Sequence, residues 1–304
     1  MILNVQQVED GTIIEGIRPF NLKAMLDCGQ AFRWVNIGEG FYRGIVGNRV
    51  IKLKQVDVNK IFIKTSTNGE DITYWIDYFD LLRDYKTIEE QLKKEPVLNK
   101  VVEYSSGNRI MKQDPWETTI SFIISANNNI PRIKKIIENL STCFGEPIEF
   151  QGKVLNSFPG PRALASVSED SIKKCGCGYR AEYIKKTADM VYEKQLDLEQ
   201  VAKMSTVEAR KELLRLPGVG PKVADCILLY SMRKFDVFPV DVWIKRTIEI
   251  LYFQGEERPL NYIREFAQER FGHLAGFAQV YMFYYARENF LIRNNALYNL
   301  FCIK

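Results

Sequence analysis

The chain has 304 residues, of which 46% are hydrophobic and 26% charged, a composition typical of a globular protein with enough apolar material for one large or two ordinary domains. Its formal net charge of +4 allows a nucleic-acid partner without arguing for one, so any such claim must rest on motifs. The single histidine, His273, argues against catalysis by a histidine-metal cluster or by a histidine general base.

The first third of the chain carries strand-like patterns, in which apolar and polar residues alternate or β-branched residues cluster. These patterns occupy 41–47, 49–56 and 61–66, and turns are predicted at 46–49 and 67–70. Helical spacing of aromatic residues and leucines follows at 71–94. We therefore predict an N-terminal domain of residues 1–105, with an antiparallel β-sheet and flanking helices.

Helical signals dominate from residue 106 to residue 304, which predicts an all-α second domain. Two helix starts are well marked. DPWE at 114–117 supplies a cap, a first-turn proline and an acidic residue, and STVE at 205–208 forms a capping box. We predict helices at about 115–126, 131–144, 180–194, 206–215, 221–233, 241–253, 260–271 and 276–289.

The most informative stretch joins two predicted helices through LPGVG at 216–220, a turn too short and too rich in glycine for anything but a tight hairpin. Gly218 and Gly220 let backbone amides approach a phosphate, and Pro221 starts a helix whose amino end attracts anions. Such an element holds the DNA backbone without reading its sequence. A turn that merely connects two core helices is the alternative, but the full LPGVGPK string is more specific than a lone G-x-G.

Lys222 lies in the first turn of the helix after the hairpin, where the positive end of the helix dipole disfavours an ammonium and favours a neutral, nucleophilic amine. Taken alone, the same lysine could equally bind phosphate. Asp241 ends the string FPVD at the predicted cap of the next helix, and packing could return it beside the lysine. A plain helix cap is the alternative for Asp241, and it is compatible with a functional role.

LPGVGPK and FPVD resemble the two defining elements of the helix-hairpin-helix DNA glycosylases, and the lysine marks the branch with lyase activity. Three further strings resemble the 8-oxoguanine DNA glycosylases of this superfamily: DCGQAFRW at 27–34, ISANNNIPR at 124–132 and GYRAEYI at 178–184. QDPWE, KVADC and AGFAQVYMF follow in the expected order, so the likeness extends over nearly the whole chain.

The resemblance implies an α+β fold. An N-terminal antiparallel β-rich domain, similar to half of a TATA-binding protein, would precede an all-α glycosylase domain at 106–304. The helix-hairpin-helix would lie at about 206–233, and the catalytic cleft would lie between two helical lobes.

The resemblance also implies the chemistry. Lys222 would attack the anomeric carbon of the deoxyribose, expel the base and form a Schiff base, after which β-elimination would nick the strand. Asp241 would stabilise the developing sugar cation and favour the free amine. At the hairpin, a structural cation that positions DNA would be held by the main-chain carbonyls of Leu214, Leu216 and Val219, with the amides of Gly218, Gly220 and Val223 on phosphate.

A pocket for an everted purine is implied by the same likeness. Cys226 and Phe283 would stack on opposite faces of the base, and Gln279 would contact its pairing edge. The carbonyl of Gly29 would accept the N7 hydrogen that only oxidised guanine carries. Ordinary packing is the alternative, because Cys226 follows Lys222 by four residues, as Phe283 follows Gln279.

Four further residues are implied on the side of the orphaned cytosine. Asn127 would fill the void, Arg132 and Arg180 would read the cytosine, and Tyr179 would be the wedge beside it. A polar loop between helices is the alternative for the NNN run, and phosphate contacts are the alternative for the arginines. Trp243 stands where well-known family members have a histidine that contacts phosphate.

The six cysteines are scattered, and the one close pair, CGC at 175–177, lacks the spacing of a zinc site, so we expect reduced thiols. The iron-sulfur branch of the superfamily needs four closely spaced cysteines after the catalytic helices, where this chain offers only Cys302. We therefore expect no organic cofactor, no catalytic metal and no iron-sulfur cluster.

The expected partner is double-stranded DNA that contains 8-oxoguanine opposite cytosine, bound by a monomer. No stretch is apolar enough for a membrane span and the amino terminus lacks the pattern of a secretion signal. We therefore expect the protein in the cytoplasm, or in the nucleus for a eukaryotic source. Two alternatives stay open: another helix-hairpin-helix glycosylase with a different lesion preference, and a DNA-binding protein without catalysis that uses the hairpin as a clamp.

Overall fold

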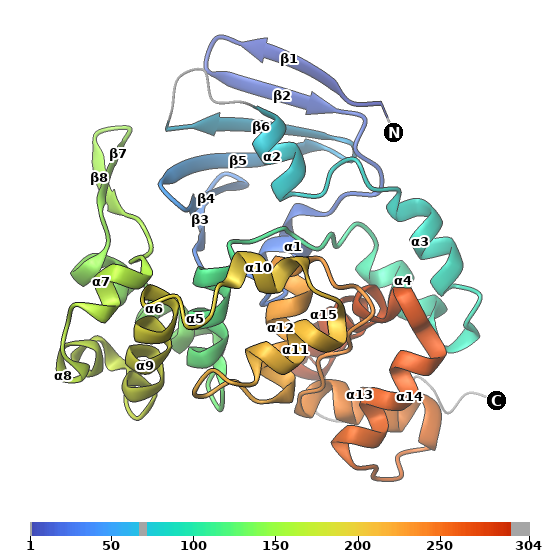
Figure 1. Ribbon diagram of the computed structural model, residues 1–304. Coiled ribbons are helices and arrows are strands. Elements are labelled where there is room, and N and C mark those ends of the chain that lie inside the picture. The colour runs from blue at the N-terminus through green and yellow to red at the C-terminus, as the bar shows by residue number, and fades with distance from the viewer. Residues whose placement is uncertain (1, 67–71, 293–304) are drawn as a thin grey trace.

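The computed structural model describes residues 2–66 and 72–292, with 290–292 described as backbone alone. Its N-terminal part is a six-stranded antiparallel sheet, and most of the remaining chain is helical (Figure 1). The predicted α+β fold, a β-rich N-terminal domain followed by a helical domain, is confirmed. The turn predicted at 67–70 and Cys302 lie outside the described residues.

The strands of the sheet are β1 (Asn4–Val8), β2 (Gly11–Glu15), β3 (Trp34–Gly38), β4 (Phe41–Val46), β5 (Arg49–Asp57) and β6 (Lys60–Thr65). They lie in the order β1-β2-β6-β5-β4-β3, and each neighbouring pair is antiparallel. The predicted strands are found as β4, β5 and β6. The other three were not predicted. β1 and β3 are edge strands, which expose most of their residues and need little apolar alternation.

One face of the sheet is buried by two helices, α1 (Leu22–Asp27) and α2 (Ile72–Tyr78). Ile61 and Ile63 of β6 point to the same face, as residues two apart in a strand do. Both belong to a buried cluster that includes Leu26 of α1 and Trp75 of α2. Burial of this face fixes the register of the sheet and therefore the position of the loop that follows α1.

Helices make up most of the rest of the chain. They are α3 (Tyr85–Leu92), α4 (Asn99–Ser105), α5 (Pro115–Ser125), α6 (Ile130–Phe144), α7 (Pro161–Ala165), α8 (Glu169–Ile172), α9 (Arg180–Tyr192), α10 (Leu198–Lys203), α11 (Thr206–Leu213), α12 (Pro221–Met232), α13 (Val242–Phe253), α14 (Leu260–Phe271) and α15 (Ala275–Ile292). Short helical turns lie at η1 (Pro96–Leu98), η2 (Lys173–Cys177) and η3 (Gly272–Leu274), and a hairpin is formed by β7 (Pro147–Phe150) and β8 (Lys153–Asn156).

The buried apolar side chains form two large clusters, one under the sheet and one within the helical part. Tyr85 of α3 and Val102 of α4 belong to the helical cluster, although both helices precede residue 106. The domain boundary at residue 105 stays a prediction. Phe32, in the loop after α1, also belongs to the helical cluster, so this loop joins the two parts of the molecule.

The centre of the helical cluster is α12, whose residues from Val223 to Met232 are all buried. Asp225 of this helix is fully buried and pairs with Arg210 of α11 at 2.7 Å and with Arg264 of α14 at 3.2 Å. α5 packs along the same helix. Because α12 is held by three neighbours, the position of its first turn is well defined.

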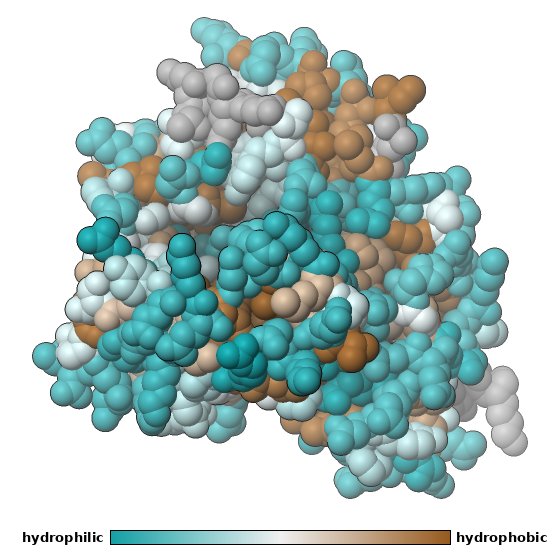
Figure 2. Space-filling view, viewed as in Figure 1, coloured by the Kyte–Doolittle hydropathy of each residue, from teal (hydrophilic) through white to brown (hydrophobic). Residues whose placement is uncertain are grey.

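The face seen in Figure 2 is mostly hydrophilic over the helices, and hydrophobic side chains show in separate patches between them and over part of the sheet. None of the helices that the structure describes is both long and apolar enough to cross a membrane.

Candidate active site

The hairpin between α11 and α12 sets the position of Lys222. Gly218 has a φ of +78°, and a Cβ added to it would lie 2.7 Å from Cδ2 of Tyr183 in α9. Only glycine therefore fits this turn, both for its backbone and for its packing. Gly220 is the N-cap of α12 and Pro221 its first residue, which places Lys222 in the first turn.

The N-terminal amides of α12 lack partners within their own helix, as at any helix start. Gly220 provides no side-chain cap, and a Cβ added to it would meet no atom within 4 Å. The space in front of the hairpin is therefore open to a ligand that accepts hydrogen bonds. This geometry suits the predicted role of the Gly218, Gly220 and Val223 amides, which stays a prediction.

The residues predicted to hold a cation offer only backbone oxygens. The carbonyl of Leu216 accepts the Val219 amide at 3.1 Å, which leaves one of its two lone pairs. Hard cations take such oxygen ligands, so the donor set of Leu214, Leu216 and Val219 fits the predicted structural ion. In the described ranges, no group of three or more histidine, cysteine or acidic side chains is placed to hold a metal.

The structure brings Asp241 toward Lys222. Asp241 is the N-cap of α13, and its carboxylate accepts the Ile244 amide at 2.8 Å. Burial raises the pKa of Asp241, while this hydrogen bond and the charge of Lys222 act in the opposite direction. The carboxylate is therefore both a helix cap and a charge within electrostatic reach of the lysine. Two helix starts, those of α12 and α13, meet at this place.

Cys226 lies one turn below Lys222 on the same face of α12. Its thiol is buried, and burial raises its pKa to about 11, so it is neutral at physiological pH. The Lys222 side chain contacts this thiol and lowers its pKa, but by less than burial raises it. Cys226 therefore presents a neutral, polarisable surface beside the amine.

The other predicted pocket residues come from the loop after α1 and from α15. Gly29 has a φ of +80°, and a Cβ added to it would lie 3.6 Å from Cε1 of Phe283 and 3.1 Å from Cδ1 of Ile130. Gln279, one turn before Phe283, is buried, and its Nε2 donates to the carbonyl of Pro239 at 3.2 Å. Pro239 precedes Asp241 by two residues, so α15 is tied to the loop that carries the carboxylate.

The residues predicted to face the opposite strand also lie together. Asn127 is exposed, with a φ of +50°, in the turn between α5 and α6. Arg180 is buried, donates to the carbonyls of Ala126 and Asn127, and stacks 4.4 Å above the ring of Tyr179. Arg132 is exposed in the first turn of α6. Arg180 thus holds the turn that presents Asn127, and its contact with cytosine stays a prediction.

Trp243 is half-buried in the first turn of α13, two residues after Asp241. Its carbonyl accepts the Thr247 hydroxyl at 2.8 Å. An indole therefore stands at the start of this helix, at the position where the resemblance implies a histidine.

Sequence reasoning missed two aromatic residues of the site. The Nζ of Lys222 lies 5.2 Å from the ring centroid of Phe122 in α5. The Phe122 ring in turn stacks on Tyr230 at 5.5 Å, with 12° between the ring planes. Tyr230 was recoverable, because it lies four residues beyond Cys226 on the predicted helix. Phe122 carried no signal of its own within the apolar string ISFIIS.

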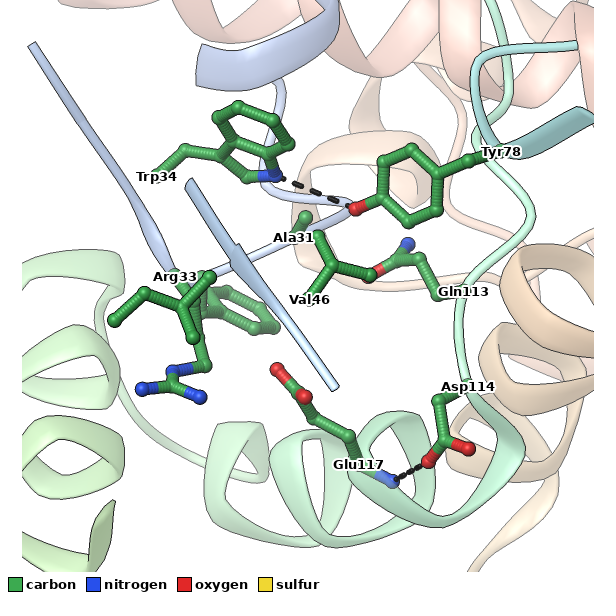
Figure 3. Close-up of a pocket in the computed structure, with 10 residues that line it drawn as sticks. Ala31, Arg33, Trp34, Val46, Tyr78, Gln113, Asp114 and Glu117 are labelled. Atoms are coloured by element: carbon green, nitrogen blue, oxygen red, sulfur yellow. Dashed lines mark hydrogen bonds between the residues drawn. The ribbon is translucent and has the colours of Figure 1, made fainter. Parts of the chain in front are cut away.

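A small cavity lies away from the lysine, at the junction of the sheet and the helices (Figure 3). Arg33, from the loop before β3, and Glu117, from the first turn of α5, both line it. Burial raises the pKa of Glu117 to about 7, and the charge of Arg33 acts in the opposite direction. Nε and Nη1 of Arg33 are buried without a hydrogen-bond partner in the described part of the chain. Lys222 and Asp241 do not line this cavity. Its lining comes from the sheet domain and from the start of α5, so it lies at the contact between them.

Two family models together match residues 12–272. The model described as the N-terminal domain of 8-oxoguanine DNA glycosylase matches residues 12–119, and that of the HhH-GPD superfamily of base excision DNA repair proteins matches residues 120–272.

Individual proteins agree with these matches. A probable N-glycosylase/DNA lyase of Methanothermobacter thermautotrophicus is 34% identical over 250 residues, which are 76% of this chain and 78% of that protein. An N-glycosylase/DNA lyase of Arabidopsis thaliana is 32% identical over 272 residues, which are 84% of this chain and 74% of that protein.

Among solved structures, the 8-oxoguanine glycosylase/lyase of Clostridium acetobutylicum, in complex with double-stranded DNA containing cytosine opposite 8-oxoguanine, superposes with a TM-score of 0.90. It is 42% identical, and the match covers 95% of this chain and 98% of that one.

Proposed function

Because the chain belongs to the 8-oxoguanine DNA glycosylases of the helix-hairpin-helix superfamily, we propose that Lys222 and Asp241 carry out its reaction. The chain is a DNA glycosylase with lyase activity at abasic sites, and it excises 8-oxoguanine in base excision repair. The observation that carries the residue assignment is the meeting of the amine and the carboxylate at the starts of α12 and α13.

In the proposed reaction, the lone pair of the Lys222 amine forms a bond to C1′ of the everted nucleoside. The glycosidic bond breaks, its electron pair leaves with the base, and the base takes up a proton. The Asp241 carboxylate stabilises the positive charge that develops on the sugar. The nitrogen then loses a proton, and the C1′–O4′ bond opens with its electron pair on O4′, which takes up a proton, to give the Schiff base. Removal of a proton from C2′ expels the 3′-phosphate by β-elimination, which cuts the strand.

Recognition of the base is proposed to rest on Gly29, Gln279, Cys226 and Phe283. The Nε2 of Gln279 is engaged by Pro239, and its Oε1 is buried without a partner in the described part of the chain. Oε1 therefore offers an acceptor to the donor edge of a guanine. The Gly29 carbonyl accepts the N7 hydrogen of the oxidised base, and Cys226 and Phe283 stack on its two faces.

The DNA duplex is proposed to be held by the hairpin on one strand and by the Asn127 turn on the other. The hairpin amides bind phosphate, and the carbonyls of Leu214, Leu216 and Val219 would hold a structural cation, which would help to position DNA. Asn127 fills the void, Tyr179 wedges beside it, and Arg132 and Arg180 contact the cytosine. Glycosylases of this family need no catalytic cofactor. We propose that a monomer acts on each lesion and that the protein works in the cytoplasm.

Reductive trapping tests the assignment of the nucleophile. The protein is incubated with a duplex that carries 8-oxoguanine opposite cytosine, in the presence of borohydride, which reduces a Schiff base to a stable covalent adduct. We expect an adduct with the unchanged chain and none with Lys222→Gln, while both bind the duplex. An adduct of equal yield with Lys222→Gln would assign the reaction to another amine. Duplexes with alkylated purines or mismatches, run in parallel, test the preference for oxidised guanine.

A further inference from the structure

Phe122 lies directly under the amine of the proposed nucleophile. Its ring is buried in α5, and the Nζ of Lys222 lies 5.2 Å from the ring centroid, within the range of a cation-π interaction. The face of a benzene ring carries partial negative charge, so it attracts a cation more strongly than a neutral amine. The ring therefore discriminates between charge states of the nitrogen above it.

The ring is held on two further sides. Tyr230 stacks on it at 5.5 Å, and Phe32 meets it edge-on at 5.6 Å with an interplanar angle of 66°. Tyr230 belongs to the Lys222 helix, and Phe32 follows Gly29 by three residues in the loop after α1. Phe122 thus contacts both α12, which carries Lys222, and the loop after α1, which carries Gly29. These two contacts fix the orientation of its ring.

The charge of the nitrogen changes during the proposed reaction. The amine must be neutral to attack C1′, but the nitrogen becomes positively charged as the new bond forms, and it is a cation again in the iminium form of the Schiff base. In the described part of the chain, the groups that interact with this nitrogen include the Asp241 carboxylate, the Cys226 thiol and the Phe122 ring. The carboxylate and the ring face both favour a cation.

We propose that Phe122 is a positioning residue whose ring face holds the positively charged nitrogen of Lys222 during formation of the covalent adduct. This inference rests on the proposed function of Lys222. The ring does not touch the substrate in this account. It acts through the nitrogen, because it stabilises the charged states that follow attack more than the neutral amine that precedes it.

A residue that only fills space could occupy the same position. The test must therefore change the negative charge on the ring face while it keeps the shape of the side chain. Phe122 is replaced by phenylalanines with one, two and three ring fluorines, which withdraw charge from the ring face. We expect the rate of borohydride-trapped adduct formation to fall stepwise, by about tenfold over the series, as loss of a desolvated cation-π contact implies. Binding of the 8-oxoguanine duplex should stay unchanged.

Phe271 supplies the matched control. It is a buried phenylalanine in α14 that stacks on Phe238, and no contact of its ring with the Lys222 amine is found in the described part of the chain. The same fluorine series at Phe271 should leave the trapping rate constant. Equal trapping rates across the Phe122 series would overturn the inference and reduce Phe122 to a packing residue. Absence of an adduct with the unmodified chain would instead contradict the proposed function, so the two failures are distinguishable.

Discussion

Asp241 combines two tasks at the residue scale, the cap of α13 and the charge beside Lys222, and one substitution separates them. Asparagine caps helices about as well as aspartate, so Asp241→Asn should change the free energy of unfolding by less than about 0.5 kcal/mol. It removes the carboxylate charge, and base excision should slow by roughly 100-fold or more. Urea unfolding and single-turnover excision measure the two effects. A large loss of stability with normal excision would make Asp241 a cap only.

Gly29 is a second residue whose backbone and surroundings act together. With a φ of +80° and Phe283 and Ile130 within 3.6 Å of an added Cβ, Gly29→Ala meets both strain and crowding. The left-handed backbone should cost about 1–2 kcal/mol of stability, and the methyl group should narrow the base pocket. We expect excision of 8-oxoguanine to fall by more than cleavage of a duplex with a preformed abasic site, which needs no base pocket. Equal losses on both duplexes would contradict the pocket assignment.

The residue scale also marks the limit of sequence reasoning. The positions of Lys222 and Asp241 at two helix starts were predictable because local motifs, a glycine hairpin and a capping aspartate, define them, and their catalytic roles stay predictions. Phe122 was not predictable. Its position over the Lys222 amine depends on how α5 packs against α12, and these segments are far apart in the chain. Arg180 was assigned to cytosine from its string alone, and its bonds to the Asn127 turn became visible only in the folded chain.

At the scale of elements, the long amphipathic helices were predicted to within a few residues, because caps and periodicity are local properties. The β7–β8 hairpin and the short helices α7, α8 and α10 were missed. These elements are too short for a clear periodicity, and their stability comes from packing. Ile148 and Leu155 of the hairpin, for example, pack with Phe150 against Ile45 and Val50 of the distant sheet.

The buried charge of Asp225 makes a prediction about α12 as an element. Its carboxylate is fully buried and pairs with Arg210 and Arg264, which tie α12 to α11 and α14. Asp225→Ala leaves both arginines without their partner, and we expect a loss of about 3 kcal/mol in the free energy of unfolding. Urea denaturation measures this loss. Glu182→Ala, which breaks the exposed pair with Lys186, is the control and should cost less than about 0.5 kcal/mol. Similar losses for both would show that Asp225 is not a structural anchor.

At the scale of the whole molecule, the sheet and the helices meet along a junction that includes the Phe32 loop and the cavity of Figure 3. The loop carries Gly29 to one end of the junction and Arg33 to the other. Gly29, which we propose to recognise the base, is therefore positioned by the contact between the sheet and the helices, which no local sequence pattern encodes. A change at the junction that leaves both cores intact should move Gly29 relative to Lys222.

Glu117 makes the junction sensitive to pH. Its pKa rises to about 7 in the folded chain, chiefly through burial, so the folded state binds its proton more tightly than the unfolded state does. The stabilisation that comes from binding this proton is fully present at pH values below the ordinary pKa of a glutamate. It is lost as the pH rises through about 7, the pKa of Glu117 in the folded chain. Glu117→Gln mimics the protonated form at every pH. The unfolding temperature of the unchanged chain should therefore fall relative to that of Glu117→Gln as the pH rises from about 5 to about 8. This range roughly spans the pKa values of Glu117 in the unfolded and folded chain. Parallel melting curves over this range measure the difference. A constant difference would mean that Glu117 keeps its charge in both states and that the nearby charge of Arg33 outweighs the effect of burial.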